Sequence, residues 1–412
     1  MLKYIRAKFR PANISHTAAP PTLAEIDPYS QAFIDSPYSA LEQLRHHSPV
    51  HRCTSGSWLL SRHRDISAAL ADPRLSNTPS DYAVVNQRHR DRYTCADVAN
   101  NTLPFMDAPQ HTEARRSIAR VFHEQLRRAS LQSNLPTDTP SDLLHDFATP
   151  LCAKTLCSLF GIAPRQQTAE LDRQLKLWAN WFFSLFSAIP SQQHRQQLDA
   201  ELHSFRQFCS GLLNQKRQHP SDDLPSALAQ LHDQTPSISD TFMADNCMLL
   251  LADGLNADYA IANALHCLLQ QPEKINQLRA KPELIPAAAD ELLRFDSPVL
   301  FIARRALEDI QLHDQLIKGN SGVLLILAAA NRDPDVFTDA NTLNFEREAK
   351  PYLSFGRGQH GCIGRVLVKQ LLELSLRWLI SEAPNFALVR TQPLWQHQAG
   401  HRWLQDLPVK IP

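Results

Sequence analysis

Glycine is concentrated at one place in this chain. Of the 11 glycines among 412 residues, four fall within the segment SFGRGQHGCIG at 354–364. Glycine adopts positive φ without strain and lets backbone approach a flat ligand closely. Cys362 lies in this segment, with His360 two residues before it and the helical pattern VLVKQLLELSLRWLI after it. A thiolate at a helix N-terminus is favoured by the helix dipole and by free backbone N–H groups. The segment indicates a metal-ligating cysteine; the alternative is a buried structural cysteine beside a glycine turn.

Amphipathic helical patterns dominate the rest of the chain. They cover 38–47, 64–72, 110–128, 141–160, 167–187, 193–217, 224–232, 239–270, 272–280, 285–295 and 362–380. Short strand-like runs lie near 49–52, 57–61, 300–305 and 322–326. No repeat or low-complexity linker divides the sequence. We therefore expect a mainly α fold with a small β portion, built as one domain over 25–412 after a flexible tail at 1–24.

The charge balance and the cysteine spacing exclude several classes of protein. Lys plus Arg equals Asp plus Glu at 42 each, so no net field attracts nucleic acid or an anionic membrane. The eight cysteines are scattered without any CxxC pair, which argues against a zinc site or a disulfide framework and favours the reducing cytoplasm. The longest apolar stretch, 247–269, is interrupted by Asp and Asn residues, so we expect no transmembrane segment.

The loop FGRGQHGCIG at 355–364 resembles the haem-binding loop of the cytochrome P-450 family, Phe-Gly-x-Gly-x-His-x-Cys-x-Gly, with every fixed position filled. The resemblance implies the cytochrome P-450 fold, with haem b (iron protoporphyrin IX) between the long central helix and the helix that follows the cysteine loop. Cys362 is then the axial thiolate ligand of the haem iron, a ligand that favours O–O cleavage. The other loop residues expected to contact the haem are Phe355, Gly356, His360 and Gly364.

Basic residues in distant segments are expected to hold the two haem propionates, because desolvated carboxylates require cationic partners. His111 and Arg115 in MDAPQHTEARRSIARVF resemble the family's His-x-x-x-Arg pair. Arg304 in RRALED resembles its Arg-x-Ala-x-Glu-Asp strand, with Arg305 as the competing choice. His360 is expected to contact a propionate as well. The alternatives are a solvated basic face and a strand-edge charge.

A second set of residues is expected to be structural. Glu291 and Arg294 are spaced i, i+3 in IPAAADELLRFDSPV, so they can share one helix face. In isolation this spacing is typical of a surface ion pair, but the segment has apolar neighbours and resembles the family's Glu-x-x-Arg helix. The resemblance implies that Arg347, in NFEREAKPYLSFG, completes a buried triad behind the haem. NFER is shorter than the usual Phe-Asp-x-x-Arg pattern.

The long central helix departs from the family pattern. Most members carry Ala/Gly-Gly-x-Asp/Glu-Thr over the open face of the haem, where the acid and the alcohol deliver protons to dioxygen at the iron. Here the stretch is LLLADGLNADYAIANAL. Aligning on Gly254 puts Asn256 at the acid position and Ala257 at the alcohol position. Asn releases no proton near neutral pH, and Ala has no donor or acceptor.

Two aspartates remain near this stretch. Asp258 lies one position beyond Ala257, and Asp253 lies one helical turn before it. A buried Asp can act as an acid when desolvation raises its pKa; either residue is alternatively a hydrogen-bonded core or solvent-side residue. Gly254 is expected to leave room for dioxygen above the iron. The candidate catalytic residues are Gly254, Asn256, Ala257 and Asp258.

The resemblance and this departure leave several functions open. The first is dioxygen-dependent monooxygenation (hydroxylation) of a small or medium apolar or aromatic metabolite of secondary metabolism, with a substrate hydroxyl or ordered water replacing the missing alcohol. The second is oxidative coupling, cross-linking or desaturation without oxygen insertion. A third is direct use of hydrogen peroxide. A non-enzymatic haem-binding sensor requires a second axial ligand such as His or Met, and the central helix offers none near Gly254.

Partners follow from what the sequence lacks and from its basic residues. No flavin or iron–sulfur motif is present, so electrons are expected from a ferredoxin or flavodoxin with its reductase. Such a partner would dock on the cysteine side, near Arg115, Arg116, Arg357 and Arg365. The loop at 75–105 carries a basic cluster, typical of a solvated loop or of contact with an anionic substrate, a carrier protein or a redox partner.

The aromatic segment LKLWANWFFSLF, which contains Trp178, Trp181 and Phe183, resembles the roof of the family's pocket. Aromatic faces there would favour a flat or extended apolar substrate. The same spacing is also typical of core packing.

Overall fold

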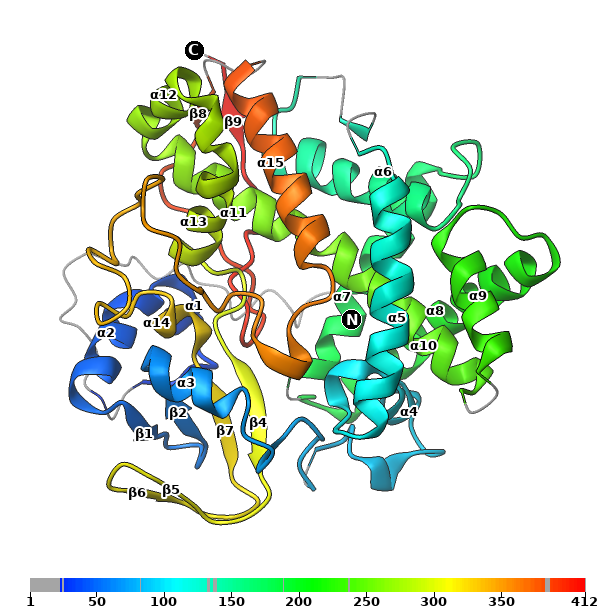
Figure 1. The fold of residues 1–412 in the computed structure, drawn as a ribbon, viewed down its shortest axis with the longest axis horizontal. Helices are drawn as coiled ribbons and strands as arrows, with labels where there is room; N and C mark the ends of the chain where they lie inside the picture. Colours follow the sequence, from blue (N-terminus) through cyan, green and yellow to red (C-terminus); the bar gives the residue numbers. More distant parts are fainter. Residues whose placement is uncertain are drawn as a thin grey trace, which may run out of the picture.

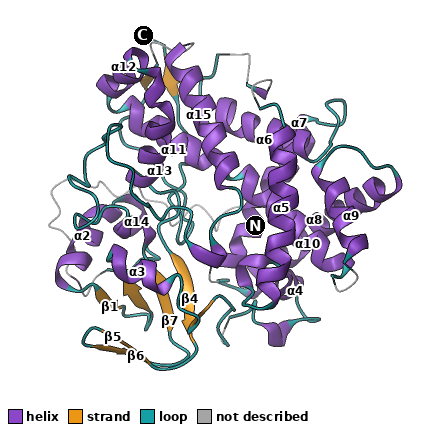
Figure 2. Ribbon diagram, in the orientation of Figure 1, coloured by secondary structure: helices purple, strands orange, loops and turns teal. Residues whose placement is uncertain are grey.

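The computed structural model describes residue 23 and residues 26–81, 83–131, 134–135, 139–187, 189–235, 238–381 and 386–411. The tail predicted at 1–24 lies outside these residues apart from Leu23. The described part is mainly helical with a small sheet portion, as the sequence predicts (Figure 2).

Most α-helices follow the predicted amphipathic ranges, but the helices Gln31–Asp35, Thr94–Asn101 and Leu327–Ala330 were not predicted, and Thr94–Asn101 lies within the predicted loop at 75–105. In the first half the α-helices are α1 (Gln31–Asp35), α2 (Pro37–His47), α3 (His63–Ala69), α4 (Thr94–Asn101), α5 (Gln110–Arg128), α6 (Thr149–Leu159), α7 (Ala169–Phe183) and α8 (Gln192–Gln218). In the second half they are α9 (Leu224–Gln234), α10 (Asp240–Leu255), α11 (Ala257–Leu269), α12 (Pro272–Ala280), α13 (Ile285–Phe295), α14 (Leu327–Ala330) and α15 (Arg365–Ser381).

Short polar side chains and prolines set several helix starts. Ser239 caps α10 by accepting a hydrogen bond from the Phe242 N–H, and Thr168 caps α7 in the same way through the Leu171 N–H. Proline occupies the first turn of α6 and of α13, where its missing N–H costs nothing. These starts were readable from the sequence because they depend only on neighbouring residues.

The main sheet has five strands in the order β1-β2-β7-β4-β3 and lies to one side of the helices (Figure 1). Its strands are β1 (Val50–Arg52), β2 (Trp58–Leu60), β3 (Leu75–Ser76), β4 (Ile302–Ala306) and β7 (Gly322–Leu325). β2 pairs parallel with β7, with Leu59 opposite Leu324, and the other pairs are antiparallel. Two small hairpin-like sheets pair β5 (Ile310–Leu312) with β6 (Gln315–Ile317) and β8 (Ala387–Leu388) with β9 (Val409–Lys410).

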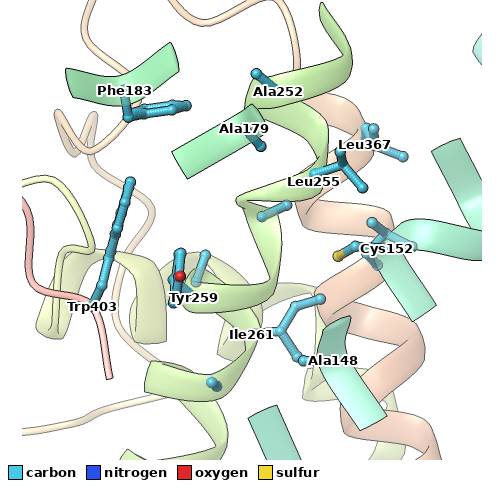
Figure 3. Packing of buried hydrophobic residues seen from close by; sticks show 14 of the residues in the cluster. Ala148, Cys152, Ala179, Phe183, Ala252, Leu255, Tyr259, Ile261, Leu367 and Trp403 are labelled. Carbon is cyan, nitrogen blue, oxygen red and sulfur yellow. The ribbon is translucent and has the colours of Figure 1, made fainter. Parts of the chain in front are cut away.

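The centre of the helical part is formed by α10 and α11. Every residue of α11 is buried, which is the behaviour of a helix surrounded by other elements. α10 packs against α6, α7 and α8, and α11 packs against α13 and α15. Figure 3 shows the buried side chains around this pair, including Tyr259 stacked on Trp403 at 4.4 Å between ring centroids.

The central helix is broken, in contrast to the single helical range 239–270 predicted from its periodicity. α10 ends at Leu255 and α11 begins at Ala257, with Asn256 between them at φ −81° and ψ 4°. This conformation belongs to the sparsely populated bridge region of backbone space. The Asn256 side chain accepts a hydrogen bond of 2.8 Å from Lys176 Nζ on α7. The break is stabilised by a contact between residues 80 positions apart in the sequence. A local sequence pattern therefore cannot predict the break.

Candidate active site

The glycine-rich loop folds back on itself before α15 begins. Gly356 and Gly358 have φ of +63° and +73°, a left-handed conformation that glycine adopts without strain. The Cys362 N–H donates to the Phe355 carbonyl at 2.8 Å, which closes the loop. The backbone N–H groups of Gly364 and Arg365 hydrogen-bond the Cys362 sulfur. A Cβ at Gly364 would lie 3.7 Å from that sulfur, so glycine keeps this side of the cysteine open.

Cys362 is suited to hold a metal rather than to exist as a free thiolate. Burial raises the pKa of its thiol to about 12, and the charge of Asp253 adds to the rise. Only coordination to a cation would keep this sulfur anionic near neutral pH. Among the described residues, no group of three or more His, Cys, Asp or Glu side chains could hold a bare metal ion. A single cysteine whose sulfur receives two backbone N–H groups fits a metal whose remaining ligands come from a cofactor.

Four basic side chains converge beside this loop. His111 and Arg115 come from α5, Arg304 comes from β4, and His360 comes from the loop itself. The His111 and His360 rings stack at 3.8 Å between centroids, and Arg115 donates a 2.5 Å hydrogen bond to the Gly361 carbonyl. None of the four makes an ion pair with a described residue.

The pKa values of His360, His111 and Arg304 are lowered, because these groups are desolvated and no nearby anion compensates for the loss of solvation. Burial lowers the pKa of His360 to about 3, with His111, Arg304 and Arg115 lowering it further. Burial also lowers the pKa of His111 to about 4 and that of Arg304 to about 10. Both ring nitrogens of the fully buried His111 find no hydrogen-bond partner among the described residues. Such a cluster requires an anionic partner, and a pair of carboxylates on a bound cofactor fits it.

Glu291, Arg294 and Arg347 lie in contact with one another. Arg294 donates to both carboxylate oxygens of Glu291, at 2.7 and 2.8 Å. Arg347 Nε lies 3.1 and 3.2 Å from the same oxygens. The two guanidinium groups also donate to backbone carbonyls of the segment that leads to the cysteine loop, including those of Asn331, Ala340 and Thr342. The short NFER spacing therefore does not prevent Arg347 from joining the triad.

Gly254 has a different role from the one predicted. A Cβ at this position would come within 2.8 Å of Leu156 Cδ1 on α6, closer than real Cβ contacts allow. The missing side chain lets α6 and α10 approach each other, and Gly254 thus faces α6 and not the cysteine loop. The expectation that it leaves room above a metal is not supported by this orientation.

Asp258 lies in a closed polar cluster. Its oxygens accept hydrogen bonds from Lys176 Nζ at 2.8 Å and from Thr149 Oγ1 at 2.7 Å, and the side chain is fully buried. Lys176 also binds Asn256 Oδ1, which leaves Asn256 Nδ2 buried without a partner among the described residues. A carboxylate held by a lysine and a hydroxyl braces the helix break. These contacts favour a structural role for Asp258 over the predicted catalytic one.

Asp253, and not its neighbours, approaches the cysteine. A Cβ at Gly364 would lie 4.0 Å from Asp253 Oδ2, and the Asp253 charge raises the pKa of the Cys362 thiol. Ala257 is buried at the start of α11. Sequence reasoning named Asp253 without selecting it. Lys176 was missed altogether, because its contacts span 80 residues or more.

Trp178 and Phe183 of the aromatic segment pack inside the molecule, whereas the arginines of the basic segment 75–105 lie on its surface. Trp178 stacks on Phe205 of α8 at 5.3 Å, so it packs between helices. Phe183 instead lies against His401 and Trp403 of the C-terminal segment (Figure 3). In the 75–105 loop the arginines Arg88, Arg90 and Arg92 are exposed. These exposed arginines favour a surface partner over a substrate enclosed in the molecule.

The comparison with known proteins decides the family. The model of the family described as Cytochrome P450 matches residues 58–383. The chain belongs to the cytochrome P450 family. It is thus a haem-thiolate enzyme of the monooxygenase class, and the site geometry fits a P450 haem: one cysteine ligand, N–H donors to its sulfur, and basic groups without an anion.

Individual P450 relatives are similar over nearly the whole chain. Mycinamicin IV hydroxylase/epoxidase of Micromonospora griseorubida is 31% identical over 369 residues, which cover 86% of this chain and 89% of the relative. P450BioI, solved with a hexadec-9Z-enoic acid ligated acyl carrier protein, has a TM-score of 0.77 at 26% identity, covering 92% of this chain and 99% of that one. CxnD, a P450 for C–S bond formation in chuangxinmycin biosynthesis, has a TM-score of 0.78 at 28% identity, covering 92% and 96%. No helix in the described part of this P450 is long and apolar enough to cross a membrane.

Proposed function

We propose that this P450 catalyses dioxygen-dependent monooxygenation, a hydroxylation, of a small or medium apolar or aromatic metabolite. The observation that carries the proposal is Cys362, held by two backbone N–H donors beside a basic cluster without an anion. The 31% identity to a hydroxylase/epoxidase supports oxygen insertion as the reaction.

The proposed cofactor is haem b, which when bound supplies the iron chemistry that activates dioxygen. Cys362 would ligate its iron, and His111, Arg115, Arg304 and His360 would hold its propionates. Phe355, Gly356 and Gly364 would shape the loop beneath it. Charged hydrogen bonds from this basic cluster orient the cofactor and shield its carboxylates from water.

Protons must reach the site without the usual acid and alcohol. Asn256 and Ala257 occupy those positions and release no proton. A substrate hydroxyl or ordered water would replace them. The Asn256 Nδ2 group, fixed by the bond that its Oδ1 accepts from Lys176, is a donor available to such a water.

Oxidative coupling without oxygen insertion is the second candidate. The absent acid–alcohol pair favours it, because a reaction that abstracts hydrogen atoms makes different proton demands from one that inserts oxygen. The similarity to CxnD, described by its C–S bond formation, favours it as well. A third candidate is an enzyme that uses hydrogen peroxide directly as its oxidant.

Electrons are proposed to come from a ferredoxin or flavodoxin with its reductase. The exposed arginines Arg116, Arg357 and Arg365 lie on or beside the elements that carry the cysteine loop and would meet an acidic partner. Arg115 is half-buried and bonded to Gly361, so it belongs to the site and not to this surface. A carrier protein is a further proposed partner, supported by the complex seen for P450BioI. We propose a cytoplasmic location, in keeping with eight free cysteines.

Product analysis under ¹⁸O-labelled dioxygen distinguishes the two reactions. A panel of apolar and aromatic metabolites, offered free and as carrier-protein thioesters, is turned over with a ferredoxin system. Labelled hydroxylated product is the expected result. Coupled or desaturated product without label would reject monooxygenation and favour the second candidate.

A further inference from the structure

Among the acidic residues of α10 and α11, Asp253 is the one for which no ionic or hydrogen-bonding partner is found among the described residues. Asp240 pairs with Arg217 at 3.2 Å, Asp245 pairs with Arg206 at 2.6 Å, and Asp258 pairs with Lys176. Asp253 makes no hydrogen bond or ion pair with any described residue. A carboxyl group without a partner inside a helical core is costly unless something else satisfies it.

Asp253 is exposed, although Ala252 and Gly254 on either side of it are buried. The surrounding protein nevertheless desolvates its carboxyl group and raises the pKa to about 6. This carboxyl group is therefore accessible to a small molecule while much of its surroundings is protein.

The direction of this carboxyl group is toward the cysteine. A Cβ at Gly364 would lie 4.0 Å from Asp253 Oδ2 and 3.7 Å from Cys362 Sγ. Since Asp253 belongs to α10 and Cys362 precedes α15, the two side chains approach from the two elements between which P450 enzymes carry their haem. The neighbouring Gly254 is turned toward Leu156 of α6 and does not compete for this space.

We propose that Asp253 is the polar protein group on the haem face opposite Cys362, in hydrogen-bond contact with whatever small molecule binds the iron there. It would then be a catalytic residue, because it touches the ligand on which the reaction takes place. The sequence offers Asp253 and Asp258 as possible acids near the empty acid position at Asn256, and Asp258 was predicted as the catalytic one. Asn256 and Ala257 occupy the positions of the family's usual acid and alcohol. The Asp253 carboxyl group would supply a hydrogen-bonding group on the same central helix.

The test uses the holoenzyme and a readout that is independent of turnover. The C–O stretching frequency of the reduced, carbon-monoxide-bound protein reports polar contacts to the bound ligand. Asp253→Leu removes the carboxyl at similar volume, and Asp253→Asn keeps a polar group. Asp240→Asn, on the exposed first turn of the same helix, controls for the change in net charge.

We expect Asp253→Leu to shift the C–O frequency and the ferric spin-state equilibrium, Asp253→Asn to give a different and smaller shift, and Asp240→Asn to leave both unchanged. Unchanged spectra in the haem-loaded Asp253→Leu and Asp253→Asn proteins would overturn the inference. If the leucine variant does not fold, the spectra of Asp253→Asn alone decide the test. The inference rests on haem bound through Cys362. A wild-type protein without a thiolate-type spectrum would reject that proposed function, whereas insensitive Asp253 variants of a normal haem-thiolate protein would reject this inference alone.

Discussion

At the scale of single residues, the site is defined by titratable side chains that find no ionic partner among the described residues. Cys362 is a half-buried thiol with two N–H donors to its sulfur. His111 and His360 stack, and Arg304 stands close enough to lower the pKa of His360. Each of these groups is unfavourable in an empty protein and favourable around an anionic metal cofactor. The cluster is therefore better explained by ligand binding than by folding.

Replacing Arg304 should weaken haem retention. In Arg304→Leu one charged partner of a propionate is lost, and a charged hydrogen bond contributes about 1.5–3 kcal/mol. We expect haem transfer to apomyoglobin to become about tenfold to a hundredfold faster. Arg305→Leu is the matched control, since Arg305 donates to Thr78 Oγ1 at 2.9 Å and stands on the next strand position. Equal haem loss from both variants would contradict the assignment of Arg304.

The residues proposed for this part of the site can be named from the sequence because each of them lies in a short motif. The cysteine loop and the Glu291–Arg294 pair depend on spacings of two to three positions. The orientation of Asp253 and Gly254 could not be predicted in the same way. Adjacent helix positions face directions about 100° apart, and which one faces α6 and which faces the loop is decided by packing.

At the scale of elements, the break between α10 and α11 is the feature that local pattern did not reveal. Periodicity predicts one helix because apolar residues recur at helical spacing through both halves. The break depends on Lys176, which comes from α7 and joins Asn256 to Asp258. Its ammonium also lies 4.0 Å from the centre of the Tyr259 ring. A lysine, an amide, a carboxylate and an aromatic ring thus fix the junction between α10 and α11.

Removing Lys176 should destabilise the fold strongly. Lys176→Met leaves Asp258 buried and unpaired, which costs about 3–5 kcal/mol. Denaturant unfolding of the holoprotein measures this loss. The matched control is Arg173→Met on the same helix, whose pair with Glu170 is exposed and should contribute less than about 1 kcal/mol. Adding Asp258→Asn to Lys176→Met should restore part of the stability; equal losses in the two single variants would contradict the brace.

The same ion pair predicts a pH dependence. Burial lowers the pKa of Lys176, but the charge of Asp258, the neighbouring Tyr259 and the hydrogen bond to Asp258 together outweigh it, and the net pKa is raised. A raised folded pKa means that the stabilisation is complete below the pKa of an unfolded lysine and is lost as pH rises through the folded value. Unfolding free energies should therefore fall more steeply at alkaline pH in wild type than in Lys176→Met. Parallel pH profiles would refute this.

An alcohol restored at the start of α11 probes how protons reach the site. Ala257→Thr replaces a small buried side chain with one that carries a hydroxyl at the family's usual position. We expect the fraction of consumed NADH that appears as product, rather than as hydrogen peroxide, to change. Ala260→Thr, one turn further along the same buried helix, controls for the added volume. Equal coupling in wild type and Ala257→Thr would mean that protons travel another way.

At the scale of the whole molecule, the small sheet and the helical body together bring distant segments to one site. β4 carries Arg304 in register with Val323 of β7, while α5 carries His111 and Arg115 (Figure 1). The mainly α class and the four predicted strand positions follow from composition and periodicity. The order β1-β2-β7-β4-β3 does not, because two- to five-residue strands carry too little pattern to specify their neighbours.

Electron delivery by an acidic redox partner is proposed to depend on the exposed arginines on the cysteine side of the molecule. Reversing two exposed residues on the cysteine side, Arg116→Glu and Arg365→Glu, should slow reduction by an acidic ferredoxin about tenfold at low salt and weaken its salt dependence. The double reversal Arg165→Glu and Arg173→Glu, before and within α7, is the control. Reduction that is insensitive to the Arg116 and Arg365 changes in stopped-flow measurements would contradict the docking surface.

The central claim is that the Cys362 sulfur binds haem iron as an anion. The most direct measurement is the absorption spectrum of the reduced, carbon-monoxide-treated protein, compared between wild type and Cys362→Ser at equal haem loading. We expect the long-wavelength Soret band of thiolate coordination in wild type and its loss in Cys362→Ser. A haem-loaded wild type without that band, or a serine variant that keeps it, would contradict the account.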